Sequence, residues 1–125
     1  NSLIYGAKKA NTDYYKGITA SSDTFYPGQE RYDTFSKYVI RDFQGSLKEW
    51  QKLNVLNFEM ESSALYTIAN AFGLKAGCIS AVIVNRTLNE TPDDSILSKA
   101  ESNLATAVKF ALESYIADRS CIFQS

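Results

Sequence analysis

The stretch NVLNFEMESSALYTIANAFGLKAGCISAVIV, residues 54–84, decides the fold class. Residues 54–58 suit a strand, and residues 61–72 place apolar side chains at helical spacing before Gly73, a typical helix stop. Residues 76–84 form an almost unbroken apolar run, which predicts a strand buried on both faces. A strand, a helix and a second strand in succession indicate an α/β protein.

The flanking sequence continues this alternation. We expect a helix over residues 2–10, a strand over residues 13–20 and a short strand over residues 38–40. A capping-box pattern predicts that a further helix begins at Ser46, and a last helix is expected from about residue 94 to residue 117. The length of 125 residues fits one domain with a real hydrophobic core.

The composition excludes several classes of function. A net charge of −1 argues against a general nucleic-acid binder, which carries a basic excess. No apolar run approaches the ~20 residues that span a bilayer, and no signal-peptide pattern opens the chain. We therefore expect a cytoplasmic protein in which Cys78 and Cys121 are reduced thiols. The absence of histidine excludes Ser-His-Asp and Cys-His catalysis and an HExxH zinc site.

Residues 20–33, ASSDTFYPGQERYD, form a polar and aromatic loop after a predicted strand. Phe25 offers a ring face, Gln29 can donate and accept hydrogen bonds, and Arg31 only donates them. This combination suits recognition of a small planar polar molecule. Alternatively, Phe25 and Tyr26 anchor the loop in the core, and Arg31 is an ordinary exposed arginine.

Two further predicted strands end in polar groups. Glu59, Met60 and Glu61 follow the first, where the carboxylates can accept hydrogen bonds from ribose hydroxyls and Met60 can pack against the sugar. The alternative is that these acids only favour the positive end of a helix dipole. Arg86 ends the second strand and either aims a fixed donor at a carbonyl or simply reaches water. Ligands of α/β proteins gather at strand ends, so these groups are candidates for one site.

Together, the motifs at residues 20–33, 58–62 and 82–87 resemble the nucleoside phosphorylase family over nearly the whole chain. The segment GQERYD, residues 28–33, is similar to the mark of its uridine-specific branch. Purine-directed members end the later strand in a Ser-Asp pair, whereas residues 85–86 here are Asn and Arg, which favours a pyrimidine. The resemblance implies a mixed central sheet flanked by helices, with residues 1–125 as the carboxyl-terminal part of a single nucleoside phosphorylase domain.

The resemblance also implies a reaction, the reversible phosphorolysis of uridine to uracil and ribose 1-phosphate, with phosphate as co-substrate and neither cofactor nor metal. Arg86 and Glu61 would be catalytic, because Arg86 would neutralise charge on the leaving uracil and Glu61 would hold the ribose hydroxyls. Phe58 stands where this branch often has tyrosine, so a ring remains but a hydroxyl is lost. The residues implied to contact the substrate are Phe25, Gln29, Arg31, Phe58, Glu59, Met60, Glu61, Ile83, Val84 and Arg86.

The family also has a phosphate site, which the resemblance places outside this chain. Its phosphate site lies largely in the amino-terminal half, with a histidine and an arginine from a neighbouring subunit, and none of these positions falls within this sequence. We therefore expect a fragment that is inactive alone and comes from a homo-hexamer, a trimer of dimers, without nucleic-acid or membrane partners. Residues 87–94 are expected to flank the pocket. A non-catalytic nucleoside-binding or storage protein, or a phosphorylase of broader pyrimidine specificity, remains an alternative.

Overall fold

The computed structural model describes residues 1–88, 91 and 93–122. The chain divides into two compact units, one made of residues 16–76 and the other of residues 1–15 together with the chain from residue 77 onward. Residues 89, 90 and 92 of the predicted pocket loop lie outside the described residues, as does the side chain of Cys121.

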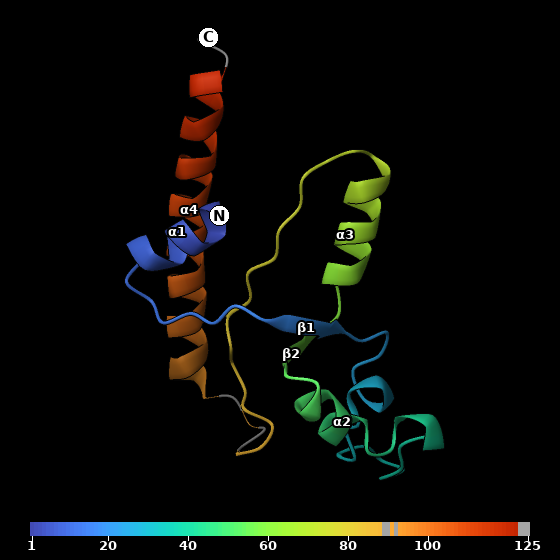
Figure 1. Ribbon diagram of the computed structural model, residues 1–125. Coiled ribbons are helices and arrows are strands. Elements are labelled where there is room, and N and C mark those ends of the chain that lie inside the picture. The colour runs from blue at the N-terminus through green and yellow to red at the C-terminus, as the bar shows by residue number, and fades with distance from the viewer. Residues whose placement is uncertain (89–90, 92, 123–125) are drawn as a thin grey trace. The chain divides into compact units, whose positions relative to one another are not determined.

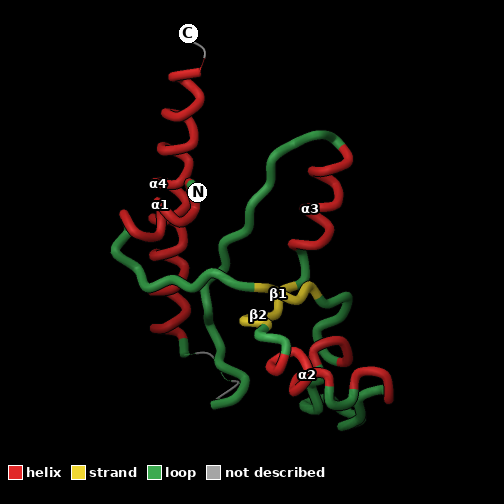
Figure 2. Tube along the Cα trace, in the orientation of Figure 1, coloured by secondary structure: helices red, strands yellow, loops and turns green. Residues whose placement is uncertain are grey.

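The unit of residues 16–76 is built on a two-stranded parallel sheet, drawn in yellow in Figure 2. Strand β1 (Ile18–Ser21) pairs with strand β2 (Val55–Glu59), and the register places Ser21 opposite Glu59. Because the strands are parallel, their carboxyl ends lie at the same edge of the sheet. Two of the three sequence motifs begin at that edge.

Short helices follow the two strands (Figure 1). After β1 come the 3₁₀ turns η1 (Pro27–Gln29) and η2 (Arg41–Phe43), and then helix α2 (Ser46–Lys52), which begins at the predicted residue. Helix α3 (Ser62–Ala71) follows β2, and Gly73 beyond it has a φ of 66°. This left-handed conformation is the glycine stop that the sequence predicts.

Residues 38–40 do not form the predicted strand. Val39 is fully buried, and its carbonyl accepts a hydrogen bond of 2.6 Å from Gln44 Nε2. The η2 turn follows immediately, with its own bond from the Phe43 N–H to the Ile40 carbonyl. Local hydrogen bonds therefore pair backbone carbonyls of this segment, which Val39 anchors by its burial, and no strand ladder forms there.

In the other unit, helix α1 (Ser2–Lys9) packs across helix α4 (Asp94–Ile122), as Figure 1 shows. A Cβ placed on Gly6 would overlap the carbonyl oxygen of Ala107 and lie 2.8 Å from the backbone nitrogen of Ala111. Only a glycine at this position lets the two helix backbones approach so closely. The close crossing of α1 and α4 therefore depends on the absence of a side chain at Gly6.

The buried face of α4 matches the expected one except at two positions. The residues predicted to face inward are Leu97, Leu104, Val108, Ala111, Leu112 and Tyr115. Ala111 is buried and four of the others are partly buried, but Leu112 is 55% exposed, and Ala107 is buried although it was not predicted. The close approach of α1 selects small residues at the contact and leaves the leucine outside it. Among the described residues, no helix combines the length and the apolar character that a membrane span requires.

The predicted strand at residues 76–84 is also wrong for this structure. Residues 74–84 carry neither helix nor strand, and Val82 is 71% exposed. A strand needs a neighbour to satisfy its backbone N–H and C=O groups. The sheet in the described part of the chain contains only β1 and β2, so this run has no strand partner there.

Candidate functional site

The loop after β1 brings together the three side chains predicted to recognise a base. Gln29 is buried, with 5% of its surface exposed, and Arg31 Nε donates a hydrogen bond of 3.4 Å to Gln29 Oε1. The guanidinium carbon of Arg31 lies 4.3 Å from the ring centroid of Phe25, which is a cation–π distance. An amide, a guanidinium and an aromatic ring thus form one contiguous group.

Local hydrogen bonds shape this loop. Ser22 Oγ donates to the Thr24 carbonyl at 2.8 Å, and the Gly28 N–H donates to Thr24 Oγ1 at 2.9 Å. The ring of Tyr26 meets Phe25 edge to face, with centroids 5.1 Å apart. Serine and threonine are typical turn residues, so this part of the geometry carries a readable sequence signal.

Glu30, between Gln29 and Arg31, is a residue that sequence reasoning missed. Its backbone is left-handed, with φ 52° and ψ 50°. Its carboxylate accepts hydrogen bonds from the N–H groups of Gly45 at 2.6 Å and Leu47 at 2.7 Å, where α2 begins. No pattern in residues 20–33 predicts these partners, because they lie 15 and 17 positions further along the chain.

Tyr32 completes the surroundings of Glu30. Its hydroxyl donates to Glu30 Oε1 at 3.2 Å. Desolvation, the hydrogen bond to Glu30 and the negative charge of Glu30 together raise the pKa of Tyr32 above its ordinary value. The phenol therefore stays protonated, and remains a donor to Glu30, throughout the neutral pH range.

The turn after β2 is organised by Glu59. Its Oε1 accepts a hydrogen bond from Ser21 Oγ on the neighbouring strand, and its Oε2 accepts from the N–H groups of Glu61 at 2.8 Å and Ser62 at 2.6 Å. The Ser63 N–H donates to Ser21 Oγ at 2.9 Å. One carboxylate and one hydroxyl therefore tie β1 and β2 to the first turn of α3.

This environment changes the acidity of Glu59. Partial desolvation alone would raise the pKa of its carboxyl, but the hydrogen bonds from Ser21, Ser62 and Glu61 outweigh it and lower the pKa from 4.5 to about 2. Both oxygens are engaged with the protein, which agrees with the helix-start interpretation of this acid. A contact between Glu59 and substrate stays a prediction.

Glu61 and Met60 differ from Glu59 in their exposure. The side chain of Met60 is exposed, and so is that of Glu61, the residue that precedes α3. Glu61 Oε2 accepts a hydrogen bond of 3.1 Å from the Met60 N–H. Phe58 lies one residue earlier than Glu59 in β2 and is partly buried. The turn thus offers one anchored acid and one that faces solvent.

The two motifs meet at the edge of the sheet. The Ser22 N–H donates to the Glu59 carbonyl at 2.8 Å, directly beyond the last paired residues. The loop that holds Gln29 and Arg31 and the turn that holds Glu61 therefore leave from adjacent strand ends. A shared position at the carboxyl edge is where α/β proteins place their ligands.

Ile83, Val84 and Arg86 belong to the other unit, so their place beside the same ligand stays a prediction. Ile83 is exposed, whereas Val84 and Arg86 are partly buried. The chain turns just after Arg86, because Asn85 Oδ1 accepts hydrogen bonds from the N–H of Thr87 at 3.0 Å and its hydroxyl at 2.7 Å. This turn explains how the arginine is presented at the end of an extended run.

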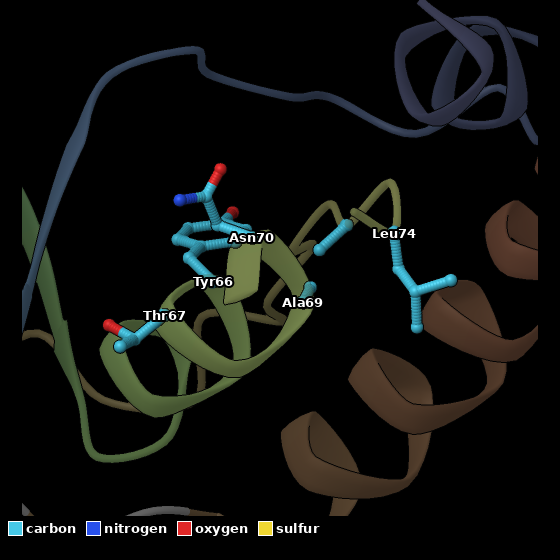
Figure 3. Close-up of a pocket in the computed structure, with 6 residues that line it drawn as sticks. Tyr66, Thr67, Ala69, Asn70 and Leu74 are labelled. Carbon is cyan, nitrogen blue, oxygen red and sulfur yellow. The ribbon is translucent and has the colours of Figure 1, made fainter. Parts of the chain in front are cut away.

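A hollow of about 540 Å³ lies on the carboxyl-terminal half of α3 and the residues that follow it (Figure 3). Tyr66 and Asn70 project from the same side of the helix, one turn apart. None of the side chains predicted to contact substrate lines it, so it does not support the predicted site. Its lining is Tyr66, Thr67, Ala69, Asn70, Leu74 and Ala76.

The remaining chemistry-bearing groups form no further centre in the described part of the chain. Cys78 is a free thiol, with its sulfur 3.6 Å from Ser80 Oγ. Across the residues that the structure describes, no group of three or more histidine, cysteine, aspartate or glutamate side chains is arranged to hold a metal ion.

Comparison with known proteins agrees with the residue pattern. The profile of the phosphorylase superfamily matches residues 1–117. Uridine phosphorylase of Haemophilus influenzae is 50% identical over 114 residues, which cover 90% of this chain and 45% of that protein. Uridine phosphorylase of Escherichia coli is 50% identical over 111 residues, covering 89% and 43% respectively.

A more distant relative is guanosine phosphorylase of Halorubrum lacusprofundi, which is 24% identical over 119 residues, or 92% of this chain and 44% of that protein. The chain therefore spans slightly less than half the length of these relatives. Because the family profile covers nearly all of its residues, this chain belongs to the phosphorylase superfamily.

Proposed function

We propose that the protein containing this chain is a uridine phosphorylase, which reversibly converts uridine and phosphate to uracil and ribose 1-phosphate. The observation that carries the proposal is the contiguous group of Phe25, Gln29 and Arg31 at a strand end, next to the turn that holds Glu61. The identity of 50% to uridine phosphorylases, against 24% to a guanosine phosphorylase, supports a pyrimidine base.

The proposal includes the place of this chain in the protein. Residues 1–125 would be the carboxyl-terminal part of a single nucleoside phosphorylase domain, whose mixed central sheet contains more strands than β1 and β2. The shares of 45% and 43% of the bacterial relatives support a chain that corresponds to one part of a longer domain.

The donors of the site suit the charge changes of phosphorolysis. Cleavage of the glycosidic bond makes the ribose cation-like and the uracil anion-like, so fixed donors to the base stabilise the transition state. Gln29 and Arg31 would hold the uracil, and Arg86 would meet the charge on its carbonyl. Each charge-assisted hydrogen bond contributes roughly 1.5–3 kcal/mol. Three such bonds supply a sizeable share of a typical barrier reduction of ~8–23 kcal/mol.

The exposed carboxylate of Glu61, in the turn after β2, is suited to bind the ribose. Glu61 would accept hydrogen bonds from ribose hydroxyls, while Met60 would pack against the apolar face of the ring. Glu59 would hold both residues in place through the bonds to the Glu61 and Ser62 N–H groups. Phe25, Phe58, Ile83 and Val84 would line the base pocket.

The remaining parts of the enzyme follow from the family. Phosphate would bind in the amino-terminal half, with residues from a neighbouring subunit, in a cytoplasmic homo-hexamer. The 125-residue chain would then hold the base and ribose side and would not catalyse phosphorolysis alone.

Assay of the full-length protein with uridine tests the proposal. We expect uracil release that depends on phosphate, and little release of base from guanosine. Uridine binding without uracil release would contradict the enzyme and favour a nucleoside-binding or storage protein. Equal turnover of uridine, 2′-deoxyuridine and thymidine would favour a phosphorylase of broader pyrimidine specificity. An intact-mass measurement of the purified protein shows whether a longer or second polypeptide is present.

A further inference from the structure

We propose that Glu30 is a positioning residue, which fixes the directions of Gln29 and Arg31 toward the pyrimidine base. The inference rests on the proposed function and assigns a role to a side chain that the reaction itself does not use. It starts from the position of Glu30 between the two predicted base-binding residues.

The backbone at Glu30 makes the turn that separates its neighbours. Its φ of 52° and ψ of 50° lie in the left-handed region, which non-glycine residues adopt only when their surroundings hold them there. The Glu30 N–H donates to the Pro27 carbonyl at 3.0 Å, and the Arg31 N–H donates to the Tyr26 carbonyl at 2.8 Å. This reversal brings Arg31 back over Phe25.

The side chain of Glu30 holds the reversal from outside the loop. Its two carboxylate oxygens accept hydrogen bonds from the Gly45 N–H at 2.6 Å and the Leu47 N–H at 2.7 Å. Bonds to an ionised carboxylate are stronger than those between neutral groups. Gly45 has a φ of 86°, so the segment that supplies these donors has a specific conformation of its own. The loop is therefore anchored to the start of α2.

The anchored turn at Glu30 determines how Gln29 and Arg31 are placed. Gln29 is buried and Arg31 Nε donates to its Oε1, so the two side chains converge across the turn at Glu30. Without the carboxylate, an ordinary residue at this position favours a right-handed or extended backbone, which would turn Arg31 away from Gln29. Both oxygens of Glu30 already accept from protein donors, so its effect reaches the base through its neighbours.

Kinetics of the synthetic direction separate this role from a general loss of structure. In the full-length protein, Glu30→Ala is expected to raise the KM for uracil by about tenfold, because small displacements of positioning groups are costly. The KM for ribose 1-phosphate should stay within about twofold, because Glu61 and Met60 lie on a different turn. Glu30→Gln keeps the size and one acceptor, so it should recover part of the uracil affinity. Asp42→Asn, at an exposed acid in η2, is the matched control and should behave as wild type.

Each outcome decides the matter. An unchanged KM for uracil, or equal rises in both KM values, would overturn the role of Glu30. If Glu30→Ala does not fold, Glu30→Gln carries the same comparison. If the wild type releases no uracil but binds it, the proposed enzyme fails and the dissociation constant of uracil replaces KM in the test. A wild type that neither binds uracil nor acts on uridine would overturn both proposals.

Discussion

The turn after β2 and the segment of residues 77–86 begin from similar sequence and reach different structures. Both follow the pattern of an apolar run that ends in polar groups. In the first, Ser21 and Glu59 tie the strand ends to α3, whereas residues 77–84 of the second form neither helix nor strand. The difference teaches that a polar strand end becomes a fixed site when a neighbouring strand and side-chain acceptors hold its backbone.

The largest effect should come from the segment of residues 77–86. Arg86→Ala in the full-length protein is expected to lower kcat for uridine by about 10²–10³-fold, because it removes a donor to the charge on the leaving base. The midpoint of urea unfolding should change little, since Arg86 is only partly buried. Arg41→Ala, at an exposed arginine in η2, is the control. Unaltered kinetics would remove residues 77–86 from the site.

A smaller effect, on stability, should come from the anchored acid. Glu59→Gln is expected to lower the free energy of unfolding by about 1–3 kcal/mol, because an amide cannot replace a carboxylate that accepts from three donors. Glu61→Gln should change that free energy by less than about 0.5 kcal/mol, since its side chain is exposed. Equal losses in the two variants would erase the distinction between these acids. Urea unfolding at pH 7 measures both.

The pH dependence of this difference follows from the pKa of Glu59. The folded protein lowers that pKa from 4.5 to about 2, so the carboxylate stabilises the fold fully above pH 4.5. Its contribution should be lost as the pH falls from 4.5 toward 2, and wild type and Glu59→Gln should then converge. A stability difference that stayed constant over this range would contradict the role of the ionised carboxylate.

The smallest expected effect is on the preference between a ribose and a deoxyribose substrate. Glu61→Gln is expected to reduce the preference for uridine over 2′-deoxyuridine by about tenfold, because a neutral amide holds the 2′-hydroxyl less strongly. The ratio of kcat/KM values for the two nucleosides is the measurement. An unchanged ratio would mean that the exposed acid of the β2 turn does not contact the ribose.

The parts of the fold that the sequence predicted depend on local signals. The helix start at Ser46 and the stop at Gly73 were confirmed as limits, although Gly45 is the N-cap of α2 and the Ser46 hydroxyl does not form the predicted cap. The strand predicted at residues 76–84 failed because pairing requires a second segment, which no local pattern reveals. Most of the predicted inner face of α4 was confirmed, but Leu112 is exposed and Ala107 is buried, because Gly6 on another helix decides which residues lie at the contact.

The same division holds for the candidate site. Phe25, Gln29 and Arg31 could be proposed from residue type alone, and in the structure Arg31 contacts both Phe25 and Gln29. The sequence did not reveal the residues that hold these three side chains in place. Glu30 finds its partners 15 and 17 positions away, and Ser21 bonds to Glu59 across 38 positions. The side chains that recognise a ligand can thus be proposed from their residue types, whereas the residues that position them are known only from the folded chain.

The extended apolar run has a consequence for handling the molecule. Residues 77–84 contain no charge, carry three β-branched valines and isoleucines in the last three positions, and expose Val82 and Ile83. Such a segment is a template for strand pairing between molecules, and only Lys75 and Arg86 flank it as charged gatekeepers. Concentrated samples of the 125-residue chain should therefore self-associate, and a partner that covers this run should keep them dispersed.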